Sequence, residues 1–141
     1  MKATKLMLGD YVSCWEGHPT KVVSIDYDYN EVNNIVWCKE PNNHLSVRFM
    51  LDEIEPIPLT PEILVKNGLE TKDGDEFVLF DNSKIDTIGE FTIIRYYAKA
   101  CRLWICKGDG VRENEIRIKC QYVHELQHAL KLCGIDKEII L

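Results

Sequence analysis

The most suggestive chemical motif in the chain is His-Glu-x-x-His, formed by His124, Glu125 and His128. Two imidazoles one helical turn apart can bind a zinc ion, and the intervening glutamate can act as general base toward a metal-bound water. A catalytic zinc also needs a third protein ligand, and the extended zinc-peptidase motif is absent because Lys131 stands where its glycine is required. A small zinc-dependent hydrolase is therefore one hypothesis for this chain.

The alternative interpretation is that these residues form the polar face of an amphipathic helix. In residues 121–134 the apolar side chains recur with helical spacing and make one stripe, and Gly134 is a stop signal. At about 100° per residue, His124 and His128 lie on the side opposite to that stripe. Imidazoles placed there would face solvent or a partner and take no part in bond cleavage, which is the interpretation we favour.

A second candidate site is the segment 95–119, in which basic residues outnumber acidic ones and aromatic residues are interleaved. Basic and aromatic side chains on a sheet can bind single-stranded nucleic acid, although alternating strands also have an ordinary polar outer face. The formal net charge of −6 makes long-range attraction of nucleic acid to the whole chain weak. Nucleic-acid binding is thus the third hypothesis, and it would involve Arg95, Arg102, Lys107 and Arg117.

The first part of the chain has short stretches rich in β-branched and aromatic residues, separated by turn residues. They predict strands at residues 8–15, 20–27, 32–38 and 45–50. Short strands with tight turns favour a small SH3-like or Tudor-like barrel. Its aromatic residues predict a binding groove or cage, or else the core and rim of the barrel. These residues are Trp15, Tyr27, Tyr29 and Trp37.

The second part of the chain follows an acidic, proline-punctuated junction at residues 51–59. Thr60, Pro61 and Glu62 form a helix start, with an N-cap hydroxyl, a proline at the first helical position and an early carboxylate. Strands are predicted at residues 76–80, 91–97, 102–106 and 115–119, before the final helix. The apolar residues of the last stretch, 137–141, are expected to dock on the protein.

The predicted fold is therefore of the α+β class. It has an N-terminal SH3-like β-barrel module at residues 1–58 and an α+β module at residues 59–141, the latter with a short helix, an antiparallel sheet and a C-terminal packing helix.

Composition favours a folded cytoplasmic protein. The 141 residues are 45% hydrophobic and 28% charged, and no apolar run approaches the length of about twenty residues that a membrane span requires. The beginning of the chain lacks the apolar run of a secretory signal. The six cysteines are scattered without a Cys-x-x-Cys pair, so we expect small, buried, reduced thiols. The preferred interpretation needs no cofactor, whereas the hydrolase hypothesis needs zinc.

Two stretches carry a resemblance to a known family: Ile54-Glu55-Pro56-Ile57-Pro58-Leu59-Thr60 and Tyr122-Val123-His124-Glu125-Leu126-Gln127. Together with residues 6–12, they resemble the pattern of a family of short uncharacterised proteins in gut-bacterial genomes, often in prophage-like or mobile regions. The resemblance brings no activity. It implies that His124 is part of a structural or binding signature to which His128 is not essential. We therefore expect a non-enzymatic accessory protein of a phage-like or mobile element that contacts an unknown protein partner.

Overall fold

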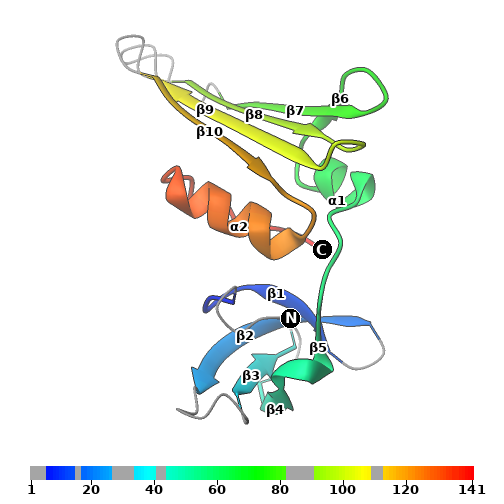
Figure 1. The fold of residues 1–141 in the computed structure, drawn as a ribbon, viewed down its shortest axis with the longest axis vertical. Coiled ribbons are helices and arrows are strands. Elements are labelled where there is room, and N and C mark those ends of the chain that lie inside the picture. The colour runs from blue at the N-terminus through cyan, green and yellow to red at the C-terminus, as the bar shows by residue number, and fades with distance from the viewer. Residues whose placement is uncertain (1–5, 15–16, 27–33, 41–43, 82–90, 109–112) are drawn as a thin grey trace. The chain divides into compact units, whose positions relative to one another are not determined.

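A computed structural model describes residues 6–14, 17–26, 34–40, 44–81, 91–108 and 113–141 (Figure 1). In these ranges the chain forms ten β-strands and two α-helices, and the strands make two five-stranded antiparallel sheets. The chain divides into two compact units, Met1–Pro58 with Tyr122–His124, and Leu59–Gln121 with Glu125–Leu141. The stretch that enters the last helix thus belongs to the first unit.

The first sheet has the strand order β4-β3-β2-β1-β5. Its strands are β1 (Tyr11–Cys14), β2 (His18–Asp26), β3 (Ile35–Lys39), β4 (Ser46–Met50) and β5 (Ile54–Pro56), and a short 3-10 helix, η2 (Leu51–Glu53), precedes β5. Successive side chains of a strand point to opposite faces of the sheet. Val12, Val22 and Val36 are therefore fully buried on one face while their neighbours along each strand are more exposed.

The prediction of an SH3-like barrel within an α+β fold is wrong. In the described part of the chain the first sheet is open, with β4 and β5 at its edges, and strands far outnumber helices. β5 lies in the junction, where the sequence predicts no strand, and pairs with β1 through Pro56 opposite Val12. An edge strand tolerates proline because its outer side makes no ladder hydrogen bonds. Local alternation predicts strands, but it says nothing about whether the outer strands close on each other.

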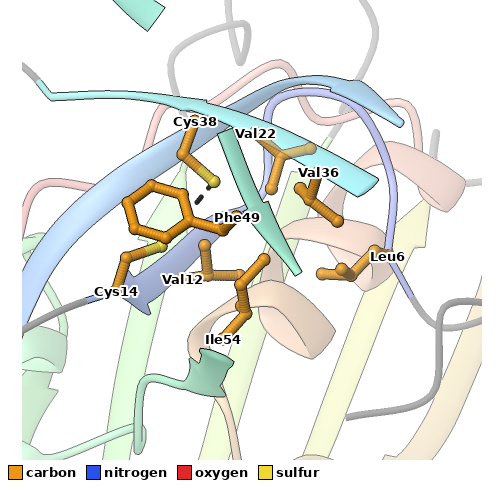
Figure 2. Close-up of a cluster of buried hydrophobic side chains, with 8 residues drawn as sticks. All are labelled: Leu6, Val12, Cys14, Val22, Val36, Cys38, Phe49 and Ile54. Atoms are coloured by element: carbon orange, nitrogen blue, oxygen red, sulfur yellow. Dashed lines mark hydrogen bonds between the residues drawn. The ribbon is translucent and has the colours of Figure 1, made fainter. Parts of the chain in front are cut away.

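Figure 2 shows the buried cluster of the first unit, formed by Leu6, Val12, Cys14, Val22, Val36, Cys38, Phe49 and Ile54. The Sγ atoms of Cys14 and Cys38 lie 3.7 Å apart, and Thr20 Oγ1 lies 3.0 Å from Cys14 Sγ. Hydrogen bonding between the thiols lowers the pKa of Cys14 to about 7 and raises the pKa of Cys38. All six cysteines are free, and Cys101 and Cys133 are only partly buried. The thiols of this cluster therefore serve as small core side chains.

The second sheet has the strand order β10-β9-β8-β7-β6. Its strands are β6 (Glu70–Thr71), β7 (Glu76–Asp81), β8 (Phe91–Tyr97), β9 (Arg102–Gly108) and β10 (Glu113–Lys119). The three strands β8, β9 and β10 pair without a register shift, so that Arg95 lies opposite Trp104 and Trp104 opposite Arg117. Side chains in one such cross-strand row lie on the same face of the sheet.

Helix α1 (Pro61–Lys66) begins as predicted. The Thr60 hydroxyl oxygen accepts a hydrogen bond from the backbone N–H of Ile63 at 3.4 Å, and Pro61 occupies the first helical position. Gly68 follows the helix with φ of +85°, a conformation that glycine adopts without strain. No helix among the described residues is both long enough and apolar enough to cross a membrane.

Helix α2 (Val123–Leu132) carries the predicted apolar stripe. Val123, Leu126, Ala129 and Leu130 are all buried. Just beyond the helix, Gly134 has φ of +68°, and Lys107 Nζ lies 3.7 Å from the place that a Cβ on this glycine would take. The C-terminal end of α2 therefore lies beside the face of the second sheet on which Lys107 is located.

Asn67 holds the last residues of the chain against α1. Its side-chain amide donates hydrogen bonds to the carbonyls of Ile63 and Ile140, both at 2.8 Å, and its oxygen accepts the N–H of Ile140 at 2.8 Å. Lys137 Nζ donates to the Asn67 carbonyl at 2.6 Å, and Ile139 is buried. The prediction that this stretch docks on the protein is confirmed.

Replacing Asn67 with alanine should lower the free energy of unfolding by about 2 to 4 kcal/mol, because the buried amide makes several bonds that alanine cannot replace. Urea unfolding followed by circular dichroism measures the change. Gln121→Ala, which removes an exposed amide side chain, is the matched control and should change the free energy by less than about 0.5 kcal/mol. Equal midpoints for the two variants would show that Asn67 does not hold the tail.

Candidate functional site

The register of the second sheet gathers basic and aromatic side chains on one face. One cross-strand row consists of Arg95, Trp104 and Arg117. The next row on the same face, two residues further along each strand, consists of Tyr97, Arg102 and Lys119. We call these six residues of β8, β9 and β10 the basic-aromatic face. On β7, Glu76 lies opposite Tyr97 and continues the second row.

The basic-aromatic face is hollowed. A cavity of about 630 Å³ is lined by all its residues together with Leu103 and Ile118. Cavities that bind small molecules or single groups of larger ligands commonly measure about 300 to 1,000 Å³. The lining combines cationic groups and aromatic rings, so the hollow suits a ligand that has both negative charge and a flat apolar part.

Arg95 and Trp104 contact each other in the lining of the hollow. The Arg95 guanidinium carbon lies 4.9 Å from the centroid of the Trp104 ring, a cation–π contact. Arg95 Nη1 lies 3.7 Å from Glu76 Oε1, too far for a hydrogen bond. Among the described residues, neither Arg95 Nε nor Trp104 Nε1 has a hydrogen-bond acceptor. Both nitrogen atoms are buried, so they do not offer free donors to a ligand in the hollow.

Two cations of this face stand directly opposite each other. Arg102 and Lys119 are cross-strand neighbours on β9 and β10, and both are exposed. In the ranges that the structure describes, neither forms an ion pair with a carboxylate. Like charges in this arrangement destabilise a sheet. The pair therefore has no evident role in stability, and an anionic ligand would relieve its repulsion.

Arg117, on strand β10 of this face, has an acidic neighbour. It pairs with Glu115 of the same strand, and its side chain is 74% exposed. An exposed pair of this kind contributes little to stability, since solvent screens the attraction. Arg117 can exchange this partner for an anionic ligand at small cost. The face as a whole keeps an excess of positive charge, although the chain carries a net charge of −6.

Lys107 is not part of the basic-aromatic face. It lies three residues beyond Trp104 on β9, so its side chain points to the other face of the sheet. Its Nζ atom lies next to Gly134 at the C-terminal end of α2, where the exposed carbonyl groups favour a positive charge. The structure thus brings together Arg95, Arg102 and Arg117 but separates Lys107, which the sequence groups with them.

The expectation that both imidazoles of the His-Glu-x-x-His motif turn outward is wrong for His124. This residue is 2% exposed, and its ring lies parallel to that of Tyr122, with centroids 5.8 Å apart and an interplanar angle of 8°. The N–H of Val123 donates to the carbonyl of Ile57 at 2.9 Å, and Tyr122 forms a β-bridge with Pro58. A helical wheel treats only the helix itself, so it misses the chain that packs against the first turn.

The other residues of the motif have separate environments. The Glu125 carboxylate accepts a hydrogen bond from the backbone N–H of Gln121 at 2.7 Å, as a capping side chain does, and His128 is half-buried. In the described part of the chain, no three His, Cys, Asp or Glu side chains are close enough together to hold a metal ion. The zinc-hydrolase hypothesis gains no third ligand from these residues and stays a prediction.

Of the residues predicted to line an aromatic groove in the first module, the structure describes only Trp37. Trp15, Tyr27 and Tyr29 lie outside the described residues. Trp37 is half-buried on β3, and its indole N–H donates to Asp26 Oδ2 at 3.1 Å. The groove therefore stays a prediction, and Trp37 has a hydrogen-bond partner within its own sheet.

Comparison with known proteins does not assign a role to any of these sites. No protein-family model, no curated protein and no solved structure matches this chain. The chemistry of the candidate site therefore follows from its own residues. Guanidinium and ammonium groups can bind anions, and Trp and Tyr rings can stack on flat groups, so the residues of the basic-aromatic face are chemically suited to binding a ligand.

Replacing His124 with alanine should lower the free energy of unfolding by about 2 to 3 kcal/mol, because it leaves a cavity beside Tyr122 at a buried site. His128→Ala is the matched control, an identical change on the same helix at a half-buried position. It should cost less than about 1 kcal/mol. Denaturant unfolding of both variants tests this difference, and equal losses would contradict the structural role assigned to His124.

Proposed function

We propose that the protein is a non-enzymatic binding protein whose basic-aromatic face binds an anionic ligand. The observation that supports this proposal is the pair of adjacent cross-strand rows, Arg95, Trp104, Arg117 and Tyr97, Arg102, Lys119, around one hollow. Arginine forms charge-assisted and often bidentate hydrogen bonds with phosphate and carboxylate groups. Arg102 and Lys119 form no ion pair with a carboxylate of the described residues, so their charges add attraction for an anion.

The negative net charge of the chain does not prevent such binding. At physiological ionic strength the Debye length is about 8 Å, so an anion in contact with the face experiences mainly the cations beside it. Charges elsewhere on the chain act chiefly on the approach of the ligand, which they slow. The proposal therefore implies modest affinity with a strong dependence on salt concentration.

The setting of this activity is also a proposal. The resemblance to short proteins of prophage-like and mobile regions in gut bacteria supports an accessory role for such an element. The six free cysteines agree with a reducing cytoplasm. The sequence places the expected protein partner at the aromatic residues of the first module or at the polar face of the last helix, and only nucleic acid at segment 95–119. The basic-aromatic face is also suited to an acidic surface of a protein partner.

Replacing Arg117 with glutamine should lower the salt concentration at which the protein elutes from immobilised heparin, because one contact with the polyanion is lost. Arg102→Gln should act in the same way. Lys107→Gln is the matched control, since it removes one positive charge from the opposite face of the same sheet, and it should elute with the unchanged protein. The proposal fails if the unchanged protein is not retained at low salt, or if Lys107→Gln shifts elution as far as Arg117→Gln.

A further inference from the structure

We infer that the ligand of the basic-aromatic face is single-stranded nucleic acid, with a base stacked in the hollow at Trp104 and phosphates at Arg102, Arg117 and Lys119. This inference rests on the proposed function and names the chemical class of the ligand for the same face. It is carried by the aromatic rings and cationic groups that line one cavity, where Arg102 and Lys119 form no ion pair with a carboxylate of the described residues.

The lining of the hollow distinguishes a nucleic acid from an acidic peptide. Cations alone would suit any polyanion. Here Tyr97 and Trp104 add aromatic rings to the cationic groups. Acidic side chains have no flat apolar group for these surfaces, whereas every nucleotide has a phosphate and a base with two π-faces. Stacking of bases on aromatic side chains beside a cationic groove is the general mode of single-strand binding.

The geometry of β10 suits a chain of phosphates. Arg117 and Lys119 are two residues apart on the same face of this strand, so their Cα atoms are separated by about 6.8 Å. Adjacent phosphates of an extended single strand have a similar spacing. Arg102 lies across from Lys119, one strand further into the sheet. The cations thus form a line along the edge strand and a second contact beside the hollow, which can hold the backbone while a base enters.

Trp104 favours a single strand over a duplex. In a duplex each base is stacked between its neighbours, so a ring on a protein surface cannot reach the π-face of a base without unstacking it. A single strand presents these faces freely. Arg95 acts through Trp104 as a positioning residue, because its guanidinium lies against the indole ring and Glu76 lies 3.7 Å from that guanidinium.

The experiment measures, by fluorescence anisotropy, the affinity of the full chain for a labelled oligothymidylate over a series of salt concentrations. The oligothymidylate has about twelve nucleotides, roughly the length of one single-strand site. Trp104→Leu should weaken binding by about five- to a hundredfold without changing the slope of log K against log salt, because one stacking contact is lost and no phosphate contact. Arg117→Gln should weaken binding and reduce the slope by about 0.7. Trp104→Phe should retain most of the affinity. The circular dichroism spectra of both Trp104 variants should match that of the unchanged protein if the sheet is intact.

Three controls separate the inference from the proposed function. An abasic strand of equal length should bind more weakly than oligothymidylate and should not respond to Trp104→Leu. Poly-glutamate and duplex DNA should also bind more weakly than the single strand. Trp37→Leu, a tryptophan change in the first sheet, should leave binding unchanged.

Equal affinity for oligothymidylate and for the abasic strand, poly-glutamate or duplex would overturn the inference and leave the proposed anion binding intact. An equal loss on changing Trp37 would also overturn it, since the site would then lie on the first sheet. Absence of binding to every polyanion at low salt would overturn the proposed function together with the inference.

Discussion

Side chains of a β-strand alternate between the two faces of a sheet, so the pairing register of β8, β9 and β10 decides which residues share a face. In the observed register the buried residues Ile94 and Ile105 lie side by side, and Arg95 lies beside Trp104 on the other face. A slip of β9 by one residue would move Trp104 into the core and Ile105 out of it. Burial of Ile94 and Ile105 therefore maintains the arrangement of the basic-aromatic face.

The two faces of this sheet carry different kinds of side chain. The face toward the interior is apolar and also contains Tyr96, whose hydroxyl donates to the carbonyl of Cys120 at 3.0 Å and whose pKa is raised by burial. The basic-aromatic face places Arg102 directly opposite Lys119. An ordinary polar face mixes charges of both signs, because opposite charges across strands stabilise and like charges do not. The Arg102–Lys119 pair departs from this rule, whereas Arg95 and Arg117 have Glu76 and Glu115 as acidic neighbours. The proposed anionic ligand would offset the repulsion within that pair.

The local structure of this chain is largely predictable from sequence. Alternation of apolar residues indicates strands, Thr60 and Pro61 indicate the start of α1, and Gly134 indicates the end of α2. These signals depend on neighbouring residues alone. The composition of segment 95–119 also indicates a basic and aromatic surface. The composition does not indicate which residues belong to that surface. Arg102 and Lys107 look equivalent in sequence but lie on opposite faces of β9.

The sequence by itself determined the positions of the helices and of most strands, because turns, caps and side-chain alternation act over a few residues. The tertiary structure decided that the first sheet stays open, that His124 is buried beside Tyr122, and that Trp104 lies between Arg95 and Arg117. Each of these features depends on pairing or packing between segments far apart in the chain. The free energy of such contacts depends on both contacting residues, and a local sequence pattern does not indicate which distant residue a side chain will contact.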